Sequence, residues 1–237
     1  MSDRKADPRP LGRRLAAEGL GAFFLFAAVI GSGIMGERLA GGNVAVALLA
    51  NTLATGAILF VLITILGPIS GAHMNPAVTM VAALRRELRR RDAAAYVAAQ
   101  LAFGIAGAWA AHLMFDLPVI QYSARIRTGL GQWLGEGIAT FGLILTILGT
   151  VRHRPQWVPA TVALYIVAAY WFTSSTSFAN PAITIARSLS DSFAGIAPAN
   201  AAAFVAAQLA GALLGWAVAK FLFPEDKSLH LGQVSAF

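Results

Sequence analysis

The chain has 237 residues, of which 57% are hydrophobic and only 12% are charged, and its mean hydropathy is +0.67. A soluble domain carries about 25% charged residues, so a soluble protein is excluded. The sequence contains no cysteine, which excludes disulfides, thiol catalysis and cysteine-ligated metals. Its histidines lack ligand spacing, so neither a metal nor a cofactor is predicted; they are His73, His112, His153 and His230.

The first apolar run, residues 15–35, follows a polar and basic stretch at residues 1–14. It contains Glu18 and is the first of several similar runs, which favours a membrane span over a signal peptide. Each run has about the 20 residues that a spanning helix needs. The sequence therefore predicts an all-α membrane protein with six transmembrane helices, the other five at residues 43–66, 93–115, 131–151, 157–174 and 199–223.

Two short segments interrupt this series, and each carries an Asn-Pro-Ala motif. Asn suits a helix N-cap and Pro suits the next position, so each motif predicts a loop that enters a helix. The helices expected at residues 75–84 and 180–189 are roughly 15 Å long, half of a hydrocarbon core. Re-entrant half-helices are tolerated where they line a cavity or a pore. The motifs are Asn75, Pro76 and Ala77, and Asn180, Pro181 and Ala182.

An internal repeat explains this layout. The sequence VAAQLA occurs at residues 97–102 and again at 205–210, and Glu18 is matched by Glu136 in a similar context. Each half has three spans, and because three is odd, the halves must lie in the membrane in opposite orientations. We therefore expect one channel domain over residues 1–237, with an inverted three-helix repeat at about 13–115 and 131–223. The half-helices would meet N-terminus to N-terminus near the midplane.

The net charge of +7 has a topological explanation. All but four of the 18 Lys and Arg residues fall on one side of the predicted spans, which places both termini in the cytoplasm by the positive-inside rule. Nucleic-acid binding is therefore not needed to explain the basic runs. The four on the other side are Arg38, Arg125, Arg127 and Arg187.

From about Arg13 to Phe223 the chain resembles the major intrinsic protein family, the aquaporins and aquaglyceroporins. The resemblance rests on the paired Asn-Pro-Ala motifs in matching places of two repeats, each preceded by its glutamate. It implies a passive channel for water and small uncharged solutes in the inner membrane, without enzymatic activity. It also implies a homotetramer, surrounded by lipid, with one pore per subunit. The amides of Asn75 and Asn180 would donate into the lumen, while the two half-helix dipoles repel cations.

The resemblance also assigns supporting roles. Glutamates at the positions of Glu18 and Glu136 hold the loop before a half-helix by accepting its N–H groups; a proton relay is the alternative, since carboxylates in a membrane are costly. Gln100 and Gln208 are expected to serve similarly. His73 either lines a vestibule and makes conduction pH-dependent or is a fixed, hydrogen-bonded loop residue.

The family's outer constriction, counted from the motifs, falls on Thr55, Ala168, Ser177 and Ile183. Water-selective members have an aromatic residue, His, a small residue and Arg there, and this chain lacks the His and the Arg. An Arg-Ser pair occurs four residues later, so Arg187 is expected to face the vestibule or cap the segment and not to fill the usual site. The predicted constriction is wide and weakly polar. A bacterial branch often found beside arsenic-resistance genes is similar, which adds arsenous acid to glycerol-like polyols as candidate solutes.

Two other functions are weighed against the channel. A secondary transporter with inverted repeats would need Glu18 or Glu136 to change partners during coupling to an ion. An intramembrane enzyme would need a base beside the serines at 174, 175 and 177, and the sequence shows none. The channel is the preferred hypothesis.

Overall fold

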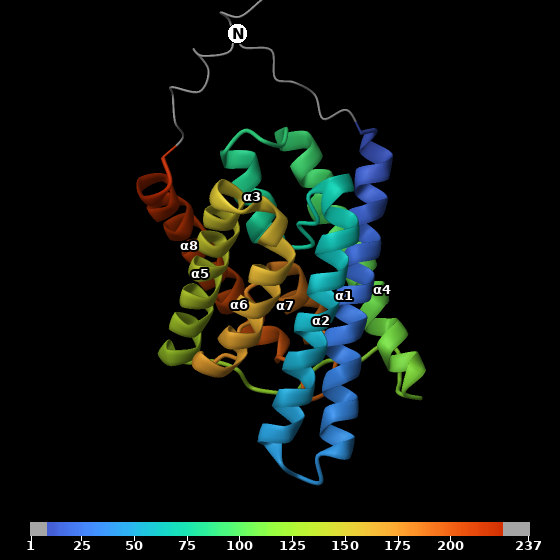
Figure 1. The fold of residues 1–237 in the computed structure, drawn as a ribbon. Coiled ribbons are helices and arrows are strands. Elements are labelled where there is room, and N and C mark those ends of the chain that lie inside the picture. Colours follow the sequence, from blue (N-terminus) through green and yellow to red (C-terminus); the bar gives the residue numbers. More distant parts are fainter. Residues whose placement is uncertain (1–8, 225–237) are drawn as a thin grey trace, which may run out of the picture.

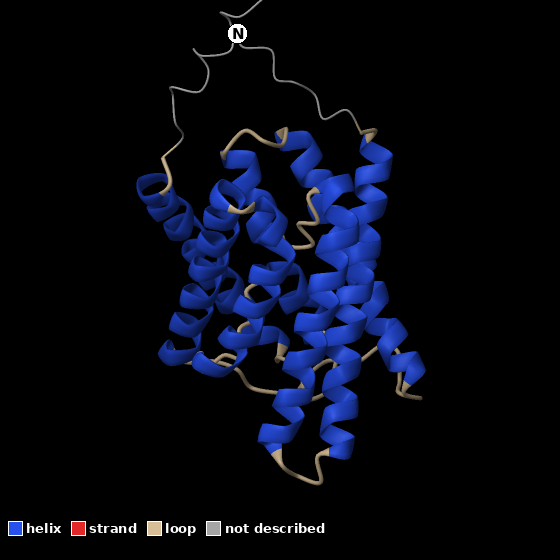
Figure 2. Ribbon diagram, in the orientation of Figure 1, coloured by secondary structure: helices blue, strands red, loops and turns tan. Residues whose placement is uncertain are grey.

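The computed structural model describes residues 9–224, so Arg4, Lys5, Lys227 and His230 lie outside the described residues. Within that range the chain is helical and contains no strand (Figures 1 and 2). The elements are α1 (Leu11–Leu39), α2 (Val44–Ser70), α3 (Pro76–Leu84), α4 (Arg90–Met114), α5 (Leu130–His153), the 3₁₀ turn η1 (Pro155–Trp157), α6 (Val158–Phe172), α7 (Pro181–Ser188) and α8 (Pro198–Leu222).

Five of these helices, α1, α2, α4, α5 and α8, are long and apolar enough to cross a membrane. The remaining predicted span, residues 157–174, forms α6, which has only 15 residues. Joined to η1 it is roughly 27 Å long at about 1.5 Å per residue, close to the thickness of a hydrocarbon core. The predicted architecture of six spans and two half-helices is confirmed.

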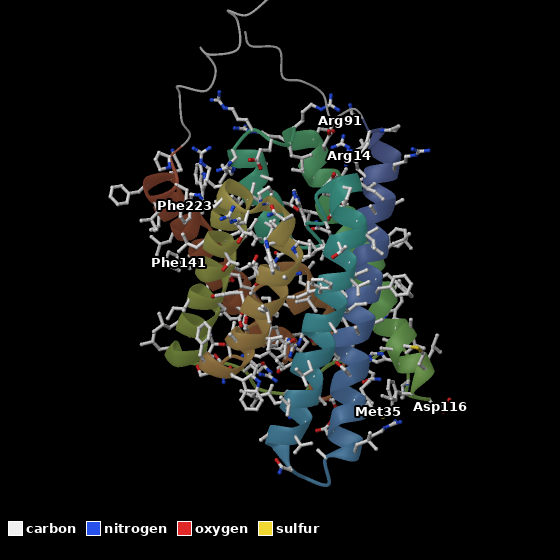
Figure 3. The ribbon with its side chains drawn as sticks, viewed as in Figure 1. Arg14, Met35, Arg91, Asp116, Phe141 and Phe223 are labelled. Atoms are coloured by element: carbon white, nitrogen blue, oxygen red, sulfur yellow. The ribbon has the colours of Figure 1, made fainter. Side chains whose placement is uncertain are left out.

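The molecule consists of two similar halves. In the first, α1 packs on α2 and α4; in the second, α5 packs on α6 and α8; the halves meet where α2 lies against α6. The two half-helices α3 and α7 lie at opposite ends of the bundle (Figure 1). We call these the α3 end and the α7 end. Figure 3 labels Arg14, Arg91 and Phe223 at the α3 end, and Met35 and Asp116 at the other.

Glycines allow the helices of each half to approach closely. A Cβ atom on Gly107 of α4 would lie 2.2 Å from the carbonyl oxygen of Phe23 in α1. The equivalent Cβ on Gly215 of α8 would lie 2.6 Å from the carbonyl oxygen of Phe141 in α5. Real atoms cannot approach so closely, so only glycine permits these helix crossings.

Polarity is arranged as expected for a protein surrounded by lipid. Large apolar side chains such as Leu53, Leu113 and Leu164 are more than half exposed on the outer surface. By contrast, Glu18 and Glu136 are completely buried between the helices. Because an unsatisfied buried charge is very costly, each of these two carboxylates must be hydrogen-bonded within the protein. The chain is thus an integral membrane protein with a polar centre.

Candidate functional site

A cavity of about 270 Å³ runs between the two half-helices. It reaches from Arg85 and Glu87, which follow α3, to Arg187 of α7. Its wall is mostly aliphatic, with side chains such as Leu59 of α2 and Leu143 of α5. We call it the central cavity.

Each half-helix begins at the asparagine of its motif. The Asn75 Oδ1 atom accepts a hydrogen bond of 2.9 Å from the Ala77 N–H. The Asn180 Oδ1 atom accepts bonds of 3.0 and 3.3 Å from the N–H groups of Ala182 and Ile183. Both asparagines are N-caps followed by proline, and the positive ends of both helix dipoles therefore point at the centre of the cavity.

The two asparagines also tie the halves together. The Asn75 Nδ2 donates to the Ala179 carbonyl at 2.8 Å, and the Asn180 Nδ2 donates to the Met74 carbonyl at 2.8 Å. From the sequence, both amide groups were expected to donate into the lumen, and these bonds between the halves were not anticipated. An amide nitrogen carries two hydrogens, so one holds the opposite loop and one is left for the cavity that both asparagines line.

The loops before the half-helices are strained at matching positions. In the first loop, Ala72 has a φ of 47° and Met74 has a φ of 48°; they lie three residues and one residue before Asn75. In the second loop, Ser177 has a φ of 48° and Ala179 has a φ of 47°; they lie three residues and one residue before Asn180. For residues other than glycine, such left-handed conformations cost about 1–3 kcal/mol each and persist only where their surroundings enforce them.

Glu18 holds the strained backbone of the first loop in place. Its Oε1 accepts hydrogen bonds from the Ser70 hydroxyl at 2.7 Å and the His73 N–H at 2.9 Å. Its Oε2 accepts bonds from the Met74 N–H and the Gln100 Nε2, both at 2.7 Å. The carboxylate is satisfied by four donors, and two of them are backbone groups of the strained loop.

Glu136 holds the strained backbone of the second loop in place in the same way. Its oxygens accept the N–H groups of Phe178 at 2.8 Å and Ala179 at 2.9 Å, and the Gln208 Nε2 at 2.6 Å. The same Gln208 nitrogen also donates to Thr184 of α7 at 2.8 Å, as Gln100 donates to Thr79 of α3 at 3.0 Å. These contacts are the ones that the predicted support role requires.

An aromatic contact is repeated beside each carboxylate. The His73 ring meets the Tyr96 ring edge-on at 5.5 Å, and the Phe178 ring meets the Phe204 ring in the same manner at 5.2 Å. The His73 Nδ1 also lies 3.1 Å from the Thr79 hydroxyl, and the residue lines the central cavity. His73 therefore lines the cavity and is at the same time a hydrogen-bonded loop residue.

Three of the four predicted filter residues, Thr55, Ser177 and Ile183, line the central cavity. Ala168 does not: it is exposed, and Ile166 and Tyr170 of α6 line the cavity instead. Two residues correspond to about 200° around a helix, so Ala168 lies on the opposite face from both. The prediction that Ala168 lines the pore is therefore wrong, and of the two α6 residues that do, Tyr170 has its hydroxyl 3.3 Å from that of Thr55.

Arg187 is 1% exposed and lines the central cavity. Its Nε donates to the Ala194 carbonyl, and its guanidinium carbon lies 3.3 Å from the centre of the Phe178 ring. Its Nη1 is buried with no hydrogen-bond partner among the described residues. Sequence reasoning named Arg187 as a vestibule candidate but did not anticipate its contact with Phe178.

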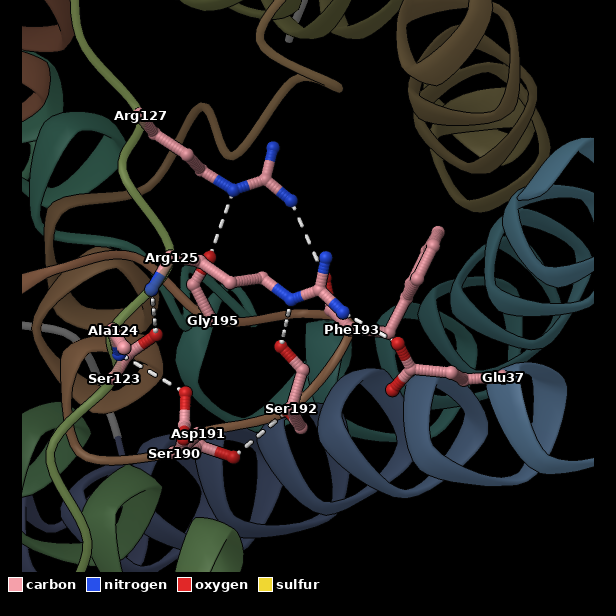
Figure 4. A network of polar contacts seen from close by, with 10 residues as sticks. All are labelled: Glu37, Ser123, Ala124, Arg125, Arg127, Ser190, Asp191, Ser192, Phe193 and Gly195. Carbon is pink, nitrogen blue, oxygen red and sulfur yellow. Dashed lines mark hydrogen bonds and ion pairs between the residues drawn. The ribbon is translucent and has the colours of Figure 1, made fainter. Parts of the chain in front are cut away.

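The loop between α4 and α5 covers the α7 end through two arginines that sequence reasoning did not single out (Figure 4). Arg125 donates to the Ser192 carbonyl at 2.7 Å and forms an ion pair with Glu37 of α1. Arg127 donates to the Gly195 carbonyl at 2.8 Å. Burial lowers the pKa of the Arg127 guanidinium to about 10, which still leaves it charged at neutral pH. The only sequence signal was their place among the few basic residues of the less basic side.

Comparisons with known proteins agree with this geometry. A family profile described as major intrinsic protein matches residues 7–174. The chain is 57% identical over 212 residues to aquaglyceroporin AqpS of Rhizobium meliloti (strain 1021), covering 90% of this chain and 91% of that protein. It is 30% identical to aquaporin AqpM of Methanothermobacter thermautotrophicus, covering 76% and 84%. The solved aquaglyceroporin from Plasmodium falciparum has the same fold, with a TM-score of 0.71, 20% identity, and coverage of 91% and 98%.

Proposed function

The chain belongs to the major intrinsic protein family and is a passive channel for water and small solutes, and we propose that it also passes uncharged solutes larger than water. The observation that carries this proposal is the lining of the cavity by Ile183, at the position where the resembled family has its filter arginine. Thr55 lines it in place of an aromatic residue. The high identity to a protein named an aquaglyceroporin supports glycerol-like polyols as solutes.

The proposed path follows from the half-helices. A neutral solute meets one free N–H of Asn75 and one of Asn180 beside an aliphatic wall. A cation at the same depth meets the positive ends of two helix dipoles, which it cannot neutralise. Solutes are therefore sorted by charge more than by size.

A coupled transporter is not favoured. Coupling would need a membrane carboxylate that changes partners, but Glu18 and Glu136 each accept at least three hydrogen bonds that hold a loop in place. Releasing either carboxylate would leave backbone donors of a strained loop unpaired, which is costly in a buried site.

The proposal extends to assembly and placement. The two repeats form one channel domain, four copies associate as a tetramer with a pore in each, and the protein lies in the inner membrane. The α3 end, where Arg14 and Arg91 lie, faces the cytoplasm with both termini, in keeping with the positive-inside rule (Figure 3). Arsenous acid is a further candidate solute, on the resemblance to the branch that lacks the filter arginine.

Stopped-flow light scattering on proteoliposomes tests the wide constriction, with water, glycerol and urea as permeants. The parent is expected to pass all three. Ile183→Arg should reduce glycerol and urea flux more than water flux, because a long charged side chain narrows the cavity. Thr55→Phe is the matched uncharged variant and should act in the same direction through volume alone. A parent that passes water but no larger solute would refute the proposal.

A further inference from the structure

We propose that Arg187 supplies the fixed cation and the solute-binding donor of the pore, reaching the filter from one helical turn beyond Ile183. The inference rests on the proposed function and deepens it, because it identifies the group that recognises a passing solute. The ligands are neutral molecules that bear hydroxyl or carbonyl oxygens, such as polyols and urea.

The first step is helical geometry. Ile183 and Arg187 are four residues apart on α7, so their side chains lie on the same helix face, and both line the central cavity. Side chains on a helix lean toward its N-terminus, which in α7 is the end at Asn180. A long side chain at residue 187 is therefore directed back along the helix toward the level of residue 183.

The second step is the observed position of the guanidinium. It lies over Phe178, 3.3 Å from the ring centre, and Tyr170, which also lines the central cavity, is a polar neighbour. Phe178 directly follows Ser177, a predicted filter residue. The charge of Arg187 thus lies beside the loop that carries the filter, although its Cα atom belongs to a later turn.

The third step concerns two buried polar groups that lack a hydrogen-bond partner. The Arg187 Nη1 and the Ser177 Oγ are both buried, both belong to residues that line the central cavity, and neither has a hydrogen-bond partner among the described residues. Their residues are 1% and 2% exposed. Buried donors and hydroxyls are normally paired, so the partner expected here is the water or solute that occupies the cavity. One donor and one hydroxyl match an oxygen-bearing neutral molecule.

The fourth step is charge. Among the described residues no carboxylate forms an ion pair with Arg187 or with Arg127, which lies over the same ring at 5.2 Å. Glu136 is engaged by backbone N–H groups. An arginine stays protonated in proteins, so Arg187 places in the cavity wall a positive charge that no ion pair among the described residues neutralises. This barrier to cations adds to that of the half-helix dipoles.

The test compares the parent with Arg187→Gln and Arg187→Lys in proteoliposomes, using water, glycerol and the cation methylammonium. The parent should pass water and glycerol and exclude methylammonium. Arg187→Gln, which removes the charge, should raise methylammonium flux by about tenfold and lower the ratio of glycerol to water flux. Arg187→Lys should still exclude the cation but lose glycerol flux, because an ammonium lacks the planar fork of donors.

Arg125→Gln is the matched control, since Arg125 lies at the same end of the molecule but does not line the central cavity and is paired with Glu37. It should leave both selectivity ratios unchanged. The double variant Ile183→Arg with Arg187→Ile should restore exclusion of methylammonium, because it moves the cation by one turn on the same face.

An Arg187→Gln channel that excludes methylammonium and keeps the parent's glycerol-to-water ratio would overturn the inference while leaving the proposed function intact. A parent without glycerol flux would instead refute the proposed function. If Arg187→Gln does not yield a monodisperse protein, Arg187→Lys and Ser177→Ala decide the matter: an unchanged glycerol-to-water ratio in both would overturn the inference.

Discussion

The half of the molecule around α3 and the half around α7 share one supporting frame. In each, a buried glutamate accepts two consecutive N–H groups of the loop, from His73 and Met74 in one half and from Phe178 and Ala179 in the other. In each, a glutamine joins that glutamate to a threonine of the half-helix. The frame is the same because both loops must hold the same strained backbone.

The linings of the two halves differ. The motif asparagines themselves are the same in both halves, but at five other equivalent distances from them the cavity-lining residues of the two halves differ. The α7 half carries the larger side chain at four of these five positions, and the α3 half carries it at one. Backbone support is therefore symmetric, whereas the chemistry presented to a solute is not. The differing pairs are Ala72 with Ser177, His73 with Phe178, Met74 with Ala179, Val78 with Ile183, and Ala82 with Arg187.

The largest expected effect tests the shared frame. Glu18→Ala and Glu136→Ala should each lower the free energy of unfolding by on the order of 3 kcal/mol or more, because each leaves buried backbone donors unpaired. Denaturant titration of the purified protein in detergent measures this loss. The frame interpretation requires similar losses in the two halves. If either variant retained the parent's stability, the two carboxylates would not have the same role.

The next effect concerns the charge barrier at the motifs. Asn75→Asp and Asn180→Asp should each raise cation leak by about tenfold, which a barrier change of about 1.4 kcal/mol produces. A carboxylate at a half-helix N-terminus neutralises part of the dipole that repels cations. A pH-sensitive dye inside proteoliposomes reports the leak. A marked difference between the two variants would show that the barrier is not shared equally by the half-helices.

Cysteine probes distinguish the two linings directly. The parent has no cysteine, so its flux should resist mercurial reagents. Ala72→Cys and Ser177→Cys should each make flux mercury-sensitive, because both positions line the central cavity. A membrane-impermeant thiol reagent should reach the first variant from the α3 end and the second from the α7 end. Blockage of both from the same side would contradict the inverted arrangement.

The smallest expected effect follows from making the halves more alike. His73→Phe removes the contact with Thr79 but keeps an aromatic ring against Tyr96, as Phe178 does against Phe204. It should lower the free energy of unfolding by about 1 kcal/mol and change water flux by less than about twofold. Thermal unfolding and stopped-flow measurements check both values. A large loss of flux would mean that His73 takes part in conduction.

Much of the frame could be predicted from the sequence because its signals are local. An Asn-Pro step specifies a capped helix start, and a carboxylate in an apolar span requires donors within the protein. The matched contexts of Glu18 and Glu136 then indicate the same role in both halves. The cross-bonds from Asn75 and Asn180 were missed because they depend on how the two loops meet, which no local pattern records.

The filter was harder to predict because it depends on helical phase. Counting twelve residues back from Asn180 selects Ala168, but the segment before the motif places Tyr170 on the cavity face. A shift of two residues moves a side chain to the opposite side of a helix. Arg187 was likewise set aside on its position in the sequence, although a long side chain on the same face as Ile183 reaches one turn back.

The unequal lengths of the helices have a consequence for the surrounding lipid. α1 and α2 have 29 and 27 residues and form a hairpin that extends beyond the other helices at the α7 end (Figure 1), whereas α6 has 15. At about 1.5 Å per residue α1 and α2 are roughly 44 and 40 Å long, whereas α6 joined to η1 is roughly 27 Å long. The hydrophobic thickness of the protein therefore varies around its perimeter. Lipid beside α6 therefore meets a shorter span than lipid beside α1 and α2, so a thinner bilayer matches the α6 side of each subunit better.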